Sequence, residues 1–150
     1  MDENAARVLI AQDRIAARVQ ELAGELTRHY AGRRPVFLGV MNGALFFLAD
    51  LVRAVALDVE ISCVRLASYA GAQSTGRVRG LDDADLREAV RDRDVLIVDD
   101  ILDTGRTLSA LAARLRELGA ADVRICVLLE KERAHEMPVR ADWTGFRIAD

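Results

Sequence analysis

Two adjacent carboxylates directly follow a buried-strand pattern, and they are the residues of this chain best suited to chemistry. Residues 95–98 form an uninterrupted, mostly β-branched apolar run that leads straight into Asp99 and Asp100. Such a run is typical of a strand buried on both faces of a parallel sheet. Open α/β sheets bind their ligands at the carboxyl ends of the strands. Adjacent carboxylates are costly to bury there without a partner, so we expect them to meet a divalent cation or sugar hydroxyls.

The segment after these carboxylates has the composition of an anion-binding turn. Residues 103–107 read Asp-Thr-Gly-Arg-Thr, and a helical pattern follows. Small residues before a helix leave backbone N–H groups free for an anion, and the two hydroxyls and the guanidinium add donors. The turn is not a Walker A loop, because GxxxxGK[ST] is absent. A plain helix N-cap at Asp103 or Thr104 is the simpler alternative. A phosphorylated sugar carrying Mg²⁺ would suit the carboxylates and the turn together.

Strand and helix patterns alternate along the rest of the chain, which predicts an α/β fold with a parallel sheet flanked by helices. Strands are expected at residues 36–41, 59–66, 95–98 and 123–129, with a short return strand at 78–81. Helices are expected at residues 15–26, 44–55 and 108–118, the last with Gly119 as its C′ residue. Residues 82–93 are predicted as a polar connection, and residues 67–80 as a mobile functional loop, because they are small, polar and too long for a tight turn.

Composition restricts the possible partners. At 150 residues, with 51% hydrophobic residues, mean hydropathy of +0.08 and net charge of −3, residues 1–150 are predicted to form one globular domain. The acidic balance argues against a nucleic-acid partner. There is no signal-peptide pattern and no apolar run of about 18 residues, so we expect no membrane partner and a cytoplasmic protein. Cys63 and Cys126 are predicted to be reduced core residues.

Residues 95–108 resemble the phosphoribosyl pyrophosphate motif of the type I phosphoribosyltransferases, in particular the hypoxanthine/guanine (6-oxopurine) branch. The resemblance implies that Asp99 and Asp100 hold the ribose hydroxyls, directly or through Mg²⁺. It makes Asp103 the general base near purine N7, a residue that distinguishes this branch from the adenine and orotate enzymes. The 5′-phosphate would be bound by the turn, namely Asp103, Thr104, Gly105, Arg106 and Thr107.

Other segments are similar to further parts of the same family. Residues 39–44 resemble its pyrophosphate loop, in which an often cis peptide exposes backbone donors, here at Asn42 and Gly43. Ser68 and Tyr69 are similar to the start of the flap that closes over the site and excludes water. Lys131 matches the lysine that donates to the exocyclic oxygen of the purine, and a donor-only ammonium disfavours the amino group of adenine.

These resemblances imply an enzyme that moves the phosphoribosyl group from phosphoribosyl pyrophosphate to hypoxanthine or guanine, as a dimer or tetramer. Residues 143–150 are similar to the segment that leads into the family's base-binding hood, and the hood is expected to be truncated at Asp150. Arg133 is a candidate to assist the pyrophosphate, but its spacing from Lys131 departs from that of the family's arginine. The alternatives are a weakly active or non-catalytic regulator that binds phosphoribosyl nucleotides, or a xanthine-preferring enzyme.

Overall fold

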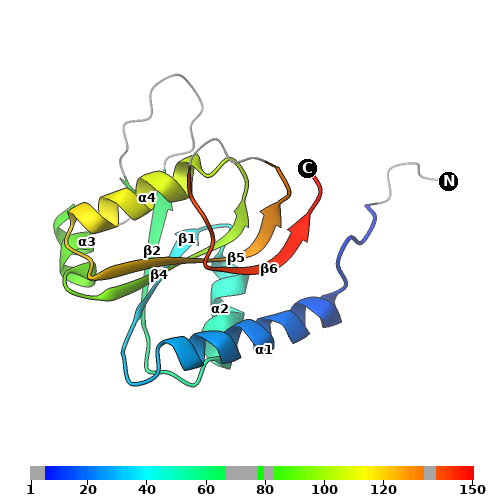
Figure 1. The fold of residues 1–150 in the computed structure, drawn as a ribbon, viewed down its shortest axis with the longest axis horizontal. Coiled ribbons are helices and arrows are strands. Elements are labelled where there is room, and N and C mark those ends of the chain that lie inside the picture. Colours follow the sequence, from blue (N-terminus) through cyan, green and yellow to red (C-terminus); the bar gives the residue numbers. More distant parts are fainter. Residues whose placement is uncertain (1–5, 67–77, 80–82, 134–137) are drawn as a thin grey trace.

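The computed structural model describes residues 6–66, 78–79, 83–133 and 138–150 (Figure 1). The helices are α1 (Gln12–His29), α2 (Leu45–Ala54), α3 (Asp83–Val90) and α4 (Arg106–Glu117). The strands are β1 (Val36–Met41), β2 (Glu60–Leu66), β3 (Val78–Arg79), β4 (Asp94–Leu102), β5 (Asp122–Lys131) and β6 (Trp143–Ile148). None of the described helices is both long and apolar enough to cross a membrane.

The strands form one sheet in the order β3-β2-β1-β4-β5-β6. Strands β2, β1, β4, β5 and β6 run parallel, and the short β3 pairs antiparallel with the end of β2. The predicted fold class, a parallel sheet flanked by helices, is confirmed. Strand β6 forms one edge of the sheet. It lies within residues 143–150, for which the resemblance implied only a segment that leads into the base-binding hood. The predicted return strand is confirmed over residues 78–79.

Each face of the sheet carries its own hydrophobic core, because alternate residues of a strand point to opposite faces. In β4, Val95 and Ile97 pack with α3 and α4, whereas Leu96 and Val98 pack with α1 and α2. Figure 1 shows the two helix pairs on opposite sides of the sheet. All four of these side chains have no exposed surface. This burial on both faces explains the unbroken apolar run at residues 95–98.

Helix α4 ends as its sequence predicts. Gly119 adopts a left-handed conformation with φ of 95°. Its N–H donates to the carbonyl of Arg116, and the N–H of Ala120 donates to the carbonyl of Leu115. This pair of bonds is a Schellman motif, which satisfies two carbonyls at the end of the helix. The predicted C′ position of Gly119 is therefore confirmed.

The prediction of a polar connection at residues 82–93 was wrong, because this segment contains helix α3. Leu86 and Val90 lie four residues apart on one face of the helix, and both are fully buried against the sheet. Two large apolar side chains on a helix otherwise made of alanine and polar residues produce a weak periodic signal. The narrow stripe is sufficient because only one edge of α3 meets the core.

One of the two cysteine predictions was also wrong. Cys126 is buried, but Cys63 is exposed on β2. Cys63 lies on the same face as Ile61, which is 51% exposed. Helix α2 packs on β1 and β4, so it leaves this face of β2 in contact with solvent.

Arg18 of α1 anchors the edge strand β6. Its Nε donates to the carbonyl of Gly145 at 2.9 Å, and its Nη2 donates to the carbonyl of Thr144 at 2.8 Å. A Cβ at Gly145 would lie 2.5 Å from the carbonyl oxygen of Leu128 on β5, so the two strands approach closely there. The helix and the glycine together hold β6 in place beside β5.

Candidate active site

Strands β1, β4 and β5 are neighbours in the sheet and run parallel. Their carboxyl ends therefore lie side by side along one border of the sheet, here called the carboxyl edge. That edge brings together segments that are far apart in the sequence: the Asn42–Gly43 turn after β1, the acidic end of β4, and Lys131 at the end of β5. The carboxyl edge of a parallel sheet is the usual ligand site of open α/β folds.

The two adjacent carboxylates lie in the last part of β4 and not beyond it, because the β4–β5 ladder continues to Leu102. Asp99 is 9% exposed, and its Oδ1 accepts a hydrogen bond from the N–H of Asp100 at 2.8 Å. Burial, and then the side chain of Asp100 beside it, raise the pKa of Asp99 well above its ordinary value. Such a pair favours a proton, a cation or hydroxyl donors as its partner.

The turn after β1 contacts this acidic pair through its backbone. The peptide bond between Met41 and Asn42 is cis. A Cβ added to Gly43 would lie 2.6 Å from Oδ2 of Asp100, which is closer than real Cβ atoms approach. Only glycine therefore lets the Asn42–Gly43 turn and the Asp100 carboxylate occupy their present positions.

The turn between β4 and α4 leaves the helix N-terminus open. Gly105 occupies the N-cap position with φ of 82° and makes no side-chain capping bond. The N-cap is therefore one or two residues later than the alternative at Asp103 or Thr104 placed it. Thr104 Oγ1 still accepts a hydrogen bond from the N–H of Arg106, the first residue of α4, at 3.3 Å. The first N–H groups of a helix have no acceptor within it, so this end of α4 suits an anion such as a phosphate.

Asp103 and Lys131 are 28 positions apart in the sequence but meet in the structure. Lys131 Nζ lies 3.5 Å from Asp103 Oδ1. Two more charged residues join them: Arg133, which the sequence related only to the pyrophosphate, and Asp150, which it did not relate to the site. Arg133 Nη2 lies 2.5 Å from Asp103 Oδ1, and Asp150 contacts both Lys131 and Arg133. The position of Arg133 just after Lys131 was the available signal, whereas nothing in the sequence pointed to Asp150.

The predicted flap residues Ser68 and Tyr69 lie outside the described residues, as do residues 67–77 and 80–82.

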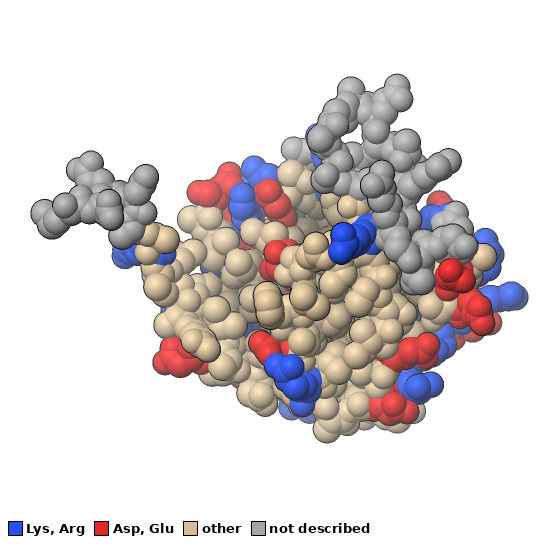
Figure 2. Space-filling view, turned by 180° about the vertical axis from the view of Figure 1, so that it is seen from behind, with Lys and Arg blue, Asp and Glu red and all other residues tan. Residues whose placement is uncertain are grey.

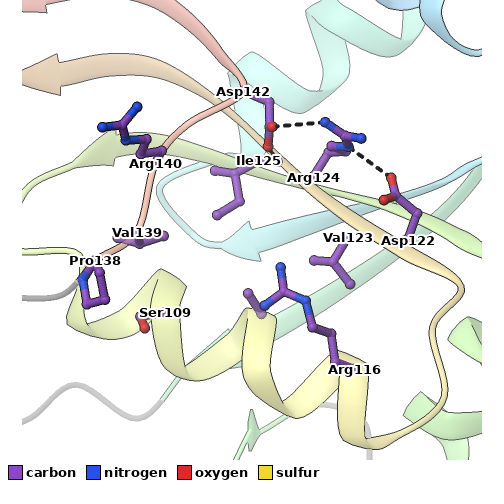
Figure 3. A pocket seen from close by; sticks show the side chains of 11 residues that line it. Ser109, Arg116, Asp122, Val123, Arg124, Ile125, Pro138, Val139, Arg140 and Asp142 are labelled. Atoms are coloured by element: carbon purple, nitrogen blue, oxygen red, sulfur yellow. Dashed lines mark hydrogen bonds and ion pairs between the residues drawn. The ribbon is translucent and has the colours of Figure 1, made fainter.

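A separate cavity of about 380 Å³ lies between α4, β5 and residues 138–142 (Figure 3). None of the predicted site residues lines it. Its Arg124 is paired with Asp122 at 3.0 Å and with Asp142 at 3.4 Å, so that positive charge is already neutralised.

Charges are mixed on the face shown in Figure 2, where the described Lys and Arg side chains lie beside Asp and Glu side chains. That face carries no continuous basic stripe among its described residues of the kind that tracks a nucleic-acid backbone. The prediction that nucleic acid is not a partner remains a prediction.

Comparison with known proteins decides the family. A model of the phosphoribosyl transferase domain matches residues 9–150. This chain belongs to the phosphoribosyl transferase domain family. The domain is 37% identical over 149 residues to the hypoxanthine-guanine phosphoribosyltransferase of Lactococcus lactis, covering 99% of this chain and 80% of that protein. It is also 37% identical to the bifunctional protein TilS/HprT of Listeria monocytogenes, of which it spans only 23%.

A solved structure gives the same result for the fold. The crystal structure of a hypoxanthine-guanine phosphoribosyltransferase from Bacillus anthracis superposes on this phosphoribosyltransferase domain with a TM-score of 0.83 at 30% identity. The match covers 97% of this chain and 83% of that protein. The predicted resemblance to the hypoxanthine/guanine branch is thus confirmed, and the roles of the individual site residues stay predictions.

Proposed function

We propose that this domain transfers the phosphoribosyl group of phosphoribosyl pyrophosphate to hypoxanthine or guanine and releases pyrophosphate, a purine salvage reaction. The observation that supports it most directly is the meeting of Asp103 with Lys131 at 3.5 Å, beside the acidic pair of β4. Asp103 can accept a proton and Lys131 can donate a hydrogen bond, as recognition of a 6-oxopurine requires.

Asp103 and Lys131 divide the recognition of the purine between them. Asp103 takes the proton from the attacking purine nitrogen as the bond from nitrogen to C1′ of the ribose forms and the bond from C1′ to pyrophosphate breaks. Lys131 donates a hydrogen bond to the exocyclic oxygen. An ammonium cannot accept a hydrogen bond, so the amino group of adenine finds no partner there.

Asp99 and Asp100 hold the ribose hydroxyls, directly or through Mg²⁺. The donor set fits this ion, which is commonly bound by one or two carboxylates together with substrate oxygens and water. Among the described residues, no group of three or more His, Cys, Asp and Glu side chains forms a complete protein cage for a metal. Bound Mg²⁺ supplies positive charge to the leaving pyrophosphate.

Backbone donors account for the remaining phosphates. The N–H groups of the Asn42–Gly43 turn face the leaving pyrophosphate, and the open N-terminus of α4 binds the 5′-phosphate through residues 104–107. The Asn42–Gly43 turn and the N-terminus of α4 both lie at the carboxyl edge of the sheet, as Asp100 does, so one substrate can contact both. The cytoplasmic location and assembly as a dimer or tetramer remain predictions.

The decisive experiment measures turnover with phosphoribosyl pyrophosphate, Mg²⁺ and a panel of hypoxanthine, guanine, xanthine and adenine. We expect turnover with hypoxanthine or guanine and none with adenine. Asp103→Asn keeps the shape of the side chain but accepts no proton, so kcat should fall by about 10²–10⁴-fold. Asp50→Asn, on the exposed side of α2, is the control and should keep wild-type kcat. No turnover with any base, despite tight binding of phosphoribosyl pyrophosphate, would favour the non-catalytic regulator, and turnover with xanthine alone would favour the other alternative.

A further inference from the structure

Four charged side chains form a set of mutual ion pairs at the carboxyl edge: Asp103, Lys131, Arg133 and Asp150. Each cation contacts both carboxylates. Lys131 Nζ lies 3.5 Å from Asp103 and 3.4 Å from Asp150, and Arg133 lies 2.5 Å from Asp103 and 3.5 Å from Asp150. The four residues come from the ends of β4, β5 and β6, so the set ties three strand ends together.

These ion pairs are partly exposed to solvent. The four side chains are between 27% and 52% exposed, and a single ion pair with this exposure contributes little to the free energy of unfolding. The set contains the two groups that we assign to the purine. Arg133 and Lys131 both approach the same oxygen of Asp103, Oδ1, and the guanidinium is the closer of the two by 1.0 Å.

We propose that Arg133 is a positioning residue for purine recognition. It holds the Asp103 carboxylate through the short contact, and Lys131 is thereby left as the more distant partner that can turn to the exocyclic oxygen of the purine. Without Arg133, the ammonium of Lys131 closes onto Asp103 and Asp150, which withdraws the donor and the acceptor from the base at the same time. A guanidinium suits this role because its fixed fork bridges two carboxylates. This inference rests on the proposed function.

The test compares Arg133→Ala and Arg133→Lys with a matched control. Arg34 also bridges two carboxylates, those of Asp58 and Glu60, but it precedes β1 at the opposite end of the sheet. We expect Arg133→Ala to lower kcat/KM for hypoxanthine by about 10- to 100-fold and to leave KM for phosphoribosyl pyrophosphate within about twofold, because only the base contacts are displaced. Arg133→Lys keeps the charge without the fork and should recover part of the loss. Arg34→Ala should keep wild-type kinetics.

A double mutant separates positioning from a structural role. If Arg133 acts through Asp103, adding Arg133→Ala to Asp103→Asn should change kcat/KM for hypoxanthine by less than about twofold, whereas independent effects would multiply. Wild-type kinetics in Arg133→Ala, multiplicative effects in the double mutant, or an equal rise in KM for both substrates would overturn the inference. Should Arg133→Ala not fold, Arg133→Lys decides: a loss of less than about threefold for hypoxanthine overturns it. An inactive wild-type enzyme would instead reject the proposed function.

Discussion

Replacing Gly43 by alanine tests the contact between the Asn42–Gly43 turn and the acidic pair. The new Cβ would lie 2.6 Å from Oδ2 of Asp100. Gly43 does not have a positive φ, so alanine meets no backbone penalty there, and the steric contact is the whole perturbation. Either the turn or the carboxylate must move.

The size of that movement follows from the distance. Carbon and oxygen atoms approach to about 3.3 Å, so the two groups must separate by about 0.7 Å. A misplacement of about 1 Å costs roughly 10²-fold in rate when it affects groups that orient a substrate. We therefore expect kcat/KM for phosphoribosyl pyrophosphate to fall by about 10- to 100-fold in Gly43→Ala.

Steady-state kinetics with varied phosphoribosyl pyrophosphate, together with thermal unfolding, is the appropriate assay. Gly24→Ala is the control, since its Cβ in α1 would meet only Arg28 Nη1 at an ordinary 3.5 Å. That control should keep wild-type kinetics and gain up to about 1 kcal/mol of stability from helix propensity. Wild-type kcat/KM in Gly43→Ala would refute the steric reasoning, and so would an equal loss in the control.

Three further predictions concern the rest of the molecule. Arg18→Ala removes two charge-assisted bonds to the carbonyls of β6 and should lower the free energy of unfolding by about 1–2 kcal/mol in a denaturant titration; a change below about 0.5 kcal/mol would contradict the anchoring role. A thiol reagent at pH 8 should label Cys63 quickly and leave Cys126 unlabelled until the chain unfolds, because burial raises the pKa of Cys126 to about 12; two fast thiols would refute this. Because the pKa of Asp99 is raised, the folded chain keeps a proton that the unfolded chain releases above about pH 4. The free energy of unfolding without metal should therefore decline above that pH until the folded carboxyl also ionises. Asp99→Asn should remove this decline, and identical pH profiles of the unfolding free energy in the two proteins would contradict the prediction.

Local patterns predicted much of the fold because periodicity and turn chemistry are properties of short segments. The run at residues 95–98 predicted a strand buried on both faces, and the helix after it was predicted with its end at Gly119. Helix α3 was missed because its buried stripe is only Leu86 and Val90, which is too little periodicity to stand out from a polar segment.

The sequence alone determined which residue types stand at the end of each strand and just after it, and hence that carboxylates, a small polar turn and a lysine were available for a phosphoribosyl site. Only the tertiary structure decided which of them meet. The order β1-β4-β5 places Gly43 against Asp100 and Lys131 against Asp103, and it adds Arg133 and Asp150 to the site. The physical reason is that spacing along the chain decides on which face, and at which end, of a helix or strand a residue lies. Which residues become neighbours across the sheet depends instead on strand order and register, and the packing of the whole domain selects these.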